Sequence, residues 1–340
     1  MIIGLVSILL LVFFLPLLLK PVEKNLEMFL FIMGFLAAII SGVWNTSLFV
    51  KAAMDPIYIS LTVLLAGLLF RWYQEPLEKS IRSLSRKMPY PIFIGSVTIV
   101  LGLVSSVITA IIAALVLVLI VTTLHLDRQS EIRFVILSCF SIGLGAALTP
   151  LGEPLSTIAI SKLNEDFFFL VRLIGPEVFA ALLIFGTLAA LLVSPPKIGK
   201  RTMRVERSSE TYEEILVRSL KIYFFIAGLT FLGAGFEPLI NQYFLDLNSK
   251  FLYWINMISA VLDNATLTAA EVSPAMNHIT IRSILIGLLM SGGMMIPGNI
   301  PNIIAANKLQ ISSKEWAMFG FPLGLVMMLV FFFAFLLTSR

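Results

Sequence analysis

Two stretches of this chain, 146 residues apart, carry the same unusual pattern. Residues 143–163 read GLGAALTPLGEPLSTIAISKL, and residues 288–309 read LLMSGGMMIPGNIPNIIAANKL. In both copies, glycine, proline and side chains with oxygen or amide groups interrupt an apolar segment. The copies agree at Gly152/Gly298, Ile158/Ile304, Ala159/Ala305, Lys162/Lys308 and Leu163/Leu309. Two related, interrupted membrane helices favour a chain built from repeats, with a binding site at the interruptions.

The composition excludes a soluble globular chain. Of 340 residues, 59% are hydrophobic and 13% are charged, and the mean hydropathy is +0.98. Apolar runs of about 17 to 25 residues recur, which is the length that crosses a hydrocarbon core of about 30 Å. We therefore expect an all-α, multi-pass membrane protein in contact with the lipid bilayer.

The residue types and motifs of the chain give little support for an enzyme or a nucleic-acid-binding protein. The single cysteine, Cys139, lies in an apolar segment, and the two histidines, His125 and His278, are far apart in the chain. Neither a metal-ligand spacing nor a nucleophile or phosphate-loop motif occurs. The net charge of +4 comes from basic loops between apolar segments. We expect no enzymatic activity, no cofactor and no nucleic-acid partner.

Basic residues predict the topology. The apolar segments cover residues 2–19, 25–43, 56–72, 91–124, 134–161, 173–193, 220–244, 250–277, 283–307 and 316–338. If 91–124 and 250–277 are re-entrant hairpins and both termini lie outside, 18 of the 24 lysines and arginines face the cytoplasm. A single crossing by 91–124 would turn the basic connector 197–221 outward, against the positive-inside rule. Charge does not separate a hairpin from two short crossings, but the short lengths favour hairpins.

The predicted elements have the same order in two halves. We expect two extra N-terminal helices in 1–55, a first repeat in 56–194, a basic cytoplasmic connector in 195–219 and a second repeat in 220–340. The hairpins open to opposite sides, so the repeats are inverted within a single membrane domain. Each repeat holds one re-entrant hairpin and one interrupted transmembrane helix. Lys51 and Asp55 are expected in an outer loop.

Polar residues in the hairpins and at the breaks are the candidate site. Two carboxylates lie in apolar sequence, where a charge costs at least about 2.5–3.5 kcal/mol. Asp263 lies in a hairpin beside Asn264 and Thr266, and Glu153 lies in the first break. Matching 104–107 to 258–261 puts Thr109 opposite Asp263; a rival match of 40–56 puts Asn45 there instead.

These residues have two possible interpretations: they bind an ion or a proton, or they cap a helix. A carboxylate that binds a cation or a proton explains the cost of burial, whereas a carboxylate at a helix N-terminus can also be a structural cap. Oxygens for a monovalent cation bound by Glu153 and Asp263 would come from Asn264, Thr266, Asn299, Asn302, Thr149, Ser156, Thr157 and Thr109. For Glu271 we expect a structural or access role, and for Glu237 and Glu177 a place at the membrane interface.

Two motifs resemble those of a known superfamily. T-P-L-G-E-P at 149–154 and S-A-V-L-D-N-A-T at 259–266 are similar to motifs of the ion transporter superfamily, which includes NhaD-type sodium/proton antiporters, arsenite permeases and sodium-coupled dicarboxylate carriers. The likeness is closer to an uncharacterised prokaryotic family described as cation transporters. It covers most of 56–338 by architecture and only these blocks by residue. The first hairpin departs from the antiporters, because Thr109 stands where they have an acidic tip.

These observations and the resemblance predict a secondary active cation transporter of a prokaryotic cell membrane. The expected reaction is exchange of Na⁺ or Li⁺ for H⁺ by alternating access, with the hairpins and interrupted helices moving against 56–72, 173–193, 220–244 and 316–338. The alternative is a sodium-coupled symporter of an organic acid or oxyanion, with its substrate on the half-helix N-termini. The superfamily also implies a possible homodimer, formed through 2–19 and 25–43.

Overall fold

The computed structural model describes residues 1–195, 211–243, 249–260, 262, 264–274 and 276–338, and all regular secondary structure in these ranges is helical. The first half contains α1 (Ile2–Leu18), α2 (Lys20–Lys24), α3 (Leu26–Ile40), α4 (Thr46–Lys87), α5 (Tyr90–Ile108), α6 (Ala110–Leu124), α7 (Arg128–Ala146), α8 (Pro154–Leu163) and α9 (Phe169–Leu192). The second half contains α10 (Tyr212–Tyr243), α11 (Ser249–Ile255), the 3₁₀ helix η1 (Asn256–Ala260), α12 (Asn264–Glu271), α13 (His278–Gly292), the 3₁₀ helix η2 (Ile296–Gly298), α14 (Ile300–Leu309) and α15 (Ser313–Thr338).

Five stretches of helix in the described residues are long and apolar enough to cross a membrane: Thr46–Leu65, Tyr90–Ile108, Phe169–Leu192, Ile215–Leu239 and Ser313–Leu336. Large apolar side chains on these helices are exposed, among them Tyr58, Val107, Leu191 and Phe333. Exposed apolar surface of this kind is favourable in contact with lipid and unfavourable in contact with water. The expected all-α membrane protein is confirmed at this level.

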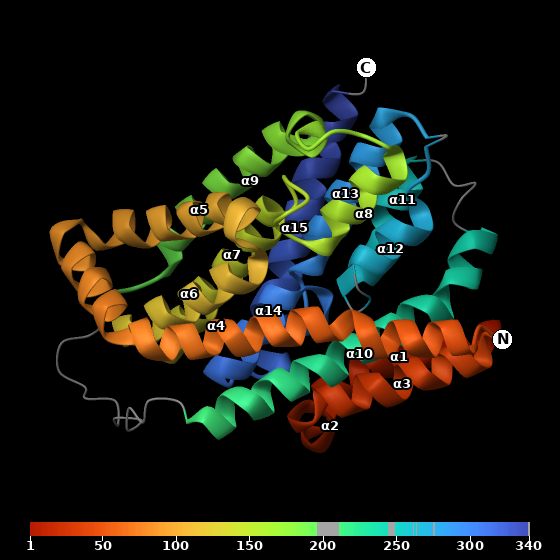
Figure 1. Ribbon diagram of the computed structural model, residues 1–340. Helices are drawn as coiled ribbons and strands as arrows, with labels where there is room; N and C mark the ends of the chain where they lie inside the picture. Colours follow the sequence, from red (N-terminus) through yellow and green to blue (C-terminus); the bar gives the residue numbers. More distant parts are fainter. Residues whose placement is uncertain (196–210, 244–248, 261, 263, 275, 339–340) are drawn as a thin grey trace.

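The helices form two groups that meet along α4 and α10. The long helices α4 and α10 lie side by side with α3 and α1 along one edge of the molecule, drawn red, orange and green in Figure 1. On the other side, α5 packs on α7 and α9, and α13 packs on α11 and α15. The grouping differs from the sequence prediction, because α9 and α15 pack with the interrupted helices and not with α4 and α10. Tertiary packing of this kind is not encoded in hydropathy.

Helix breaks occur in both halves. Thr109 separates α5 from α6 with a φ of 76°, a conformation that costs a β-branched residue about 1–3 kcal/mol. Residues 147–153 separate α7 from α8, and residues 293–299 separate α13 from α14. Pro154 and Pro301 stand in the first turns of α8 and α14, where a proline starts a helix without losing a hydrogen bond.

Two predicted boundaries are wrong. The helix predicted to start at residue 56 starts at Thr46, where the Asn45 side chain caps it by accepting a hydrogen bond of 2.8 Å from the Leu48 amide. Lys51 and Asp55 therefore lie in α4 and not in a loop, and the expected division at 55/56 falls inside a helix. The connector was expected to reach residue 219, but α10 already begins at Tyr212. Residues 196–210 lie outside the described part of the chain.

Arg128 joins the start of α7 to the α14–α15 junction. Its guanidinium donates to the Leu309 and Gln310 carbonyl oxygens at 3.0 and 2.7 Å, and holds both carboxylate oxygens of Glu315 at 2.9 and 2.8 Å. The carbonyls at the end of α14 have no partner within that helix, so this contact satisfies them. The planar fork of an arginine fits such an arrangement, and a lysine does not.

We expect Arg128→Lys to lower the free energy of unfolding by about 1–2 kcal/mol, because lysine loses the fork and most of the carbonyl contacts. Thermal unfolding in detergent measures the effect. The control is Arg172→Lys, whose partner Asp166 forms a fully exposed pair. Equal unfolding temperatures for the two variants would contradict the bracing role of Arg128.

Candidate functional site

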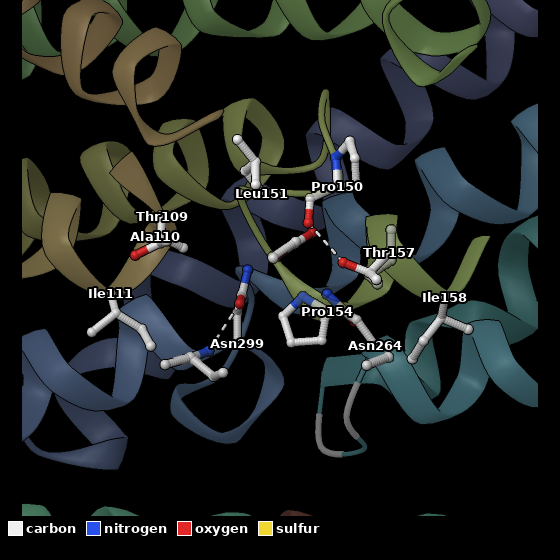
Figure 2. Close-up of a pocket in the computed structure, with 15 residues that line it drawn as sticks. Thr109, Ala110, Ile111, Pro150, Leu151, Pro154, Thr157, Ile158, Asn264 and Asn299 are labelled. Carbon is white, nitrogen blue, oxygen red and sulfur yellow. Dashed lines mark hydrogen bonds between the residues drawn. The ribbon is translucent and has the colours of Figure 1, made fainter. Parts of the chain in front are cut away.

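A cavity of about 380 Å³ lies where four helices begin. The first residues of α6, α8, α12 and α14, which are Ala110, Pro154, Asn264 and Ile300, all line it. Helix contacts fix this junction, because α8 packs on α12 and α6 packs on α14, so that each helix meets one from the other half of the chain. Two interruptions far apart in sequence thus open into one space (Figure 2).

Glu153 and Asn299 occupy matching positions in this wall. Each is the residue that precedes a ten-residue helix, and their backbone angles are nearly the same: φ −154° and ψ 159° for Glu153, φ −155° and ψ 148° for Asn299. The Asn299 Oδ1 accepts a hydrogen bond of 2.8 Å from the Ile300 amide. Glu153 is 8% exposed and lines the cavity. The site therefore holds one buried carboxylate and one amide at equivalent helix starts.

Three further predicted residues lie in the same wall. Asn264 is 4% exposed, and neither atom of its amide group has a hydrogen-bond partner within the described residues. Thr157 donates to the Pro150 carbonyl oxygen at 2.7 Å, across the break, and Thr109 accepts a long hydrogen bond from the Ile112 amide. In Figure 2, Asn299 and Asn264 lie on either side of Pro154. The Asn264 amide, which lies against Gly292 of α13, therefore keeps donor and acceptor capacity that no described residue uses.

Three other predicted residues support the breaks and lie outside the cavity. Thr149 donates a short hydrogen bond to the Ser106 carbonyl oxygen in α5, and Ser156 donates to the Ala147 carbonyl oxygen at 3.0 Å. Asn302 donates to the carbonyl oxygens of Gly292 and Met295 at 2.8 and 2.9 Å. All three side chains are buried. Each supplies a donor to a carbonyl oxygen at or just beyond the end of a helix, where partners within the helix are missing.

For two predicted residues, Asp263 and Thr266, the structure does not describe the side chain. Asp263 lies outside the described residues, directly before Asn264 in the chain. Thr266 belongs to α12, and its side chain lies outside the described part. The position of Asn264 in the cavity wall therefore shows that this end of the hairpin lies at the cavity.

Asn302→Ala tests the support of the second break. The change leaves two buried carbonyl oxygens without their donor, and each loss costs about 1–3 kcal/mol. We expect a clear fall in the unfolding temperature in detergent. Gln310→Ala is the control, since Gln310 donates to a single exposed carbonyl, that of Asn307, at 2.7 Å. A shift no larger than that of the control would show that water replaces the Asn302 amide.

The helix starts give the cavity a positive potential. Each helix N-terminus carries about half a positive elementary charge, so four of them sum to about two charges. The Ala110 amide already donates to the Gly152 carbonyl oxygen at 3.0 Å, and Glu153 contributes a negative charge. Glu153 thus places a negative charge where four helix N-termini meet, an arrangement in which the charge and the helix dipoles attract each other.

Three further acids, Glu177, Glu237 and Glu271, have different surroundings. Glu177 on α9 forms an ion pair with Arg282 on α13, and Glu237 on α10 is exposed. Glu271 at the end of α12 is 1% exposed. Its neighbour Asn256 in η1 is fully buried and was not among the predicted residues. An asparagine within an apolar run was the signal that could have drawn attention to it.

These features define a class: a helical membrane protein with a mainly apolar cavity, lined by one carboxylate, two amides and two hydroxyl groups, at the junction of two helix breaks. The chain belongs to a family of proteins of unknown function, DUF1646, whose family model matches residues 2–338. A comparison with curated proteins finds no match. The family match extends over all elements that form the cavity.

Proposed function

We propose that this chain is a secondary active transporter that exchanges Na⁺ or Li⁺ for protons at the cavity around Glu153. The observation that carries the proposal is a buried carboxylate that shares one cavity with the side chains of Asn264, Asn299, Thr157 and Thr109. Carboxylate, amide and hydroxyl oxygens are ligands that a hard cation accepts. An acid buried in a membrane is costly and usually marks an ion or proton path.

Matching local geometry in the two halves supports the proposed inverted repeat and with it a transport mechanism. Helices α8 and α14 are offset by 146 residues at both ends, and their C-caps Asn164 and Gln310 have nearly equal angles, φ 55° and ψ 44° against φ 51° and ψ 42°. Hydrogen bonds recur at the same offset: Glu165 to Ile160, and Ile311 to Ala306. In transporters, such repeats place the binding site at their junction and give alternating access by rocking one unit against another.

The helix contacts suggest which parts move. We assign the fixed frame to α3, α4 and α10, and the moving unit to α5–α9 with α11–α15, because contacts within each group are extensive. The two hairpins, α5–α6 and α11–α12, would be re-entrant in this arrangement. The exposed faces of α1 and α3 remain the proposed homodimer surface, and outward termini in a prokaryotic cell membrane remain the proposed orientation.

Exchange follows from competition for one carboxylate. A proton on Glu153 removes the negative charge that attracts the cation, and a bound cation favours the ionised form. Opening of the cavity to one side and then the other would couple outward cation flow to inward proton flow. Asp263, the residue before Asn264, is the second proposed acid.

Purified protein in liposomes tests this function. We expect an imposed gradient of Na⁺ or Li⁺ to drive proton movement between pH 6 and 9, read with a pH-sensitive dye inside the vesicles. K⁺ and choline serve as cation controls, and protein-free vesicles control for leakage. An absence of any sodium- or lithium-dependent proton movement over this range would exclude the antiport function.

The four helix starts favour one second candidate, sodium-coupled uptake of an organic acid or oxyanion. Helix N-termini bind anions through free amide groups and the helix dipole. Against this candidate, Glu153 already supplies a negative charge to the cavity, and its described lining residues include no lysine or arginine. Sodium-driven uptake of labelled succinate or sulfate, without proton release, would favour the symporter.

A further inference from the structure

Glu271 is a second buried acid, separate from the cavity. It is the last residue of α12, seven positions after Asn264, which is about 10 Å along a helix. Its side chain is 1% exposed, and neither carboxylate oxygen has a hydrogen bond of ordinary geometry within the described residues. A buried carboxylate without donors costs several kcal/mol in its charged form.

The neighbour of Glu271 lacks a donor as well. Asn256 in η1 lies against the Glu271 carboxyl group and is fully buried. Its Nδ2 donates to the Ile284 carbonyl oxygen at 3.3 Å, which leaves Oδ1 with no donor among the described residues. A proton on Glu271 would supply the missing donor for Oδ1. A neutral Glu271 can therefore donate to Oδ1, whereas an ionised Glu271 leaves Oδ1 without a donor and has only the second N–H of Asn256 Nδ2 to accept from.

Among the described residues, no charged side chain forms an ion pair that would compensate an ionised Glu271. The helices packed against α12 are α8, α10 and α13. Their described charged and titratable side chains are Lys162 on α8; Tyr212, Glu213, Lys221, Tyr223 and Glu237 on α10; and His278 and Arg282 on α13. None of these forms an ion pair with Glu271, and Arg282 is paired with Glu177. The last carbonyls of α12 add negative potential at the same place.

We propose that Glu271 and Asn256 form a proton-binding site that is distinct from the ion cavity and holds the hairpin against α13 while Glu271 is neutral. Loss of the proton leaves a buried carboxylate with too few donors, and this end of the hairpin lies near the protein surface, where Pro274, three residues on, is exposed. Movement of Glu271 toward solvent would carry α12 with it, since the helix is short and continuous. Its first residue, Asn264, would then move in the cavity wall.

The first half of the chain lacks this site. In the alignment that pairs Thr109 with Asp263, Glu271 corresponds to Leu117 and Asn256 to Gly102. Leu117 is fully buried in α6, so an apolar side chain fills the equivalent place. A carboxyl group is therefore not needed for packing here. The acid and the asparagine occur together in one half only, which points to a function for the pair.

Infrared spectroscopy tests the site without any transport assay. We expect wild-type protein in detergent at neutral pH to show the carbonyl stretching band of a protonated carboxylic acid, and Glu271→Gln to lose it. Glu165→Gln, in the loop after α8, should leave the band unchanged. Asn256→Leu should shift the band without removing it, because the acid loses one hydrogen bond. An unchanged band in Glu271→Gln would overturn the proposal.

The effect on transport rests on the proposed antiport. A site that must be protonated loses occupancy about tenfold per pH unit above its titration point. We expect Glu271→Gln, which stays neutral, to keep cation transport but lose part of its pH dependence in liposomes. The same pH dependence as in the wild type would exclude the coupling. If the wild type transports no cation, the antiport proposal fails, while the infrared band still decides whether Glu271 binds a proton.

Discussion

We expect Glu153→Gln to abolish the proposed sodium- or lithium-dependent proton movement in liposomes. The variant keeps the shape of the side chain, so the cavity and the start of α8 should remain intact. It removes the one described carboxylate in the cavity wall and with it both the proton carrier and the charged cation ligand. Removal of one partner of a buried charge pair costs about 3 kcal/mol, which corresponds to a loss of about 100-fold or more in cation affinity.

Two controls separate a loss of transport function from a loss of folded protein. Glu165→Gln makes the same chemical change twelve residues further along the chain, in the loop that follows α8, and should transport at the wild-type rate. The unfolding temperature of Glu153→Gln should equal or exceed that of the wild type, because a buried charge is removed. Wild-type exchange by Glu153→Gln would remove Glu153 from the mechanism.

Gly145→Ala should yield little folded protein. A Cβ atom on Gly145 in α7 would overlap the carbonyl oxygen of Gly102 in α5 and lie against its Cα atom. Backbone atoms stand on both sides of this contact, so neither side can turn away as a side chain would. Overpacking usually costs about 1–3 kcal/mol, and we expect the upper end or more here. Size-exclusion profiles and unfolding temperatures in detergent measure the loss.

A matched glycine has room for the same change. A Cβ atom on Gly175 in α9 would lie 3.7 Å from Val171 Cγ1 and 3.9 Å from Phe179 Cε2, both ordinary contacts. Gly175→Ala should therefore fold normally and gain up to about 1 kcal/mol from helix propensity. A normal yield of folded Gly145→Ala would show that α5 and α7 can separate without loss of the fold.

The helix breaks were predictable, because their residues act locally. Gly152, Pro154, Gly298 and Pro301 cannot continue a regular helix without cost, and the structure has breaks at these places. The start of α4 was missed for the opposite reason. The apolar segment was predicted to begin at residue 56, although Pro56 lies inside a long helix, and the capping signal of Asn45 was not recognised.

The composition of the cavity could be predicted only in part. Glu153, Asn264, Asn299, Thr157 and Thr109 share one wall, but nothing in the sequence separates them from Thr149, Ser156 and Asn302, which donate to backbone carbonyls. The difference depends on which way each side chain turns from its break. Contacts between halves, such as α8 with α12, depend on tertiary packing that hydropathy does not encode.

Proton release on cation addition tests the proposed exchange at Glu153 most directly. Purified protein in weakly buffered detergent solution receives NaCl or LiCl, and a pH electrode records the change. We expect the wild type to release protons in a saturable manner, with choline chloride as the control salt. Glu153→Gln should release far fewer. Saturable cation binding with no proton release, or equal release by the wild type and Glu153→Gln, would contradict exchange at this carboxylate.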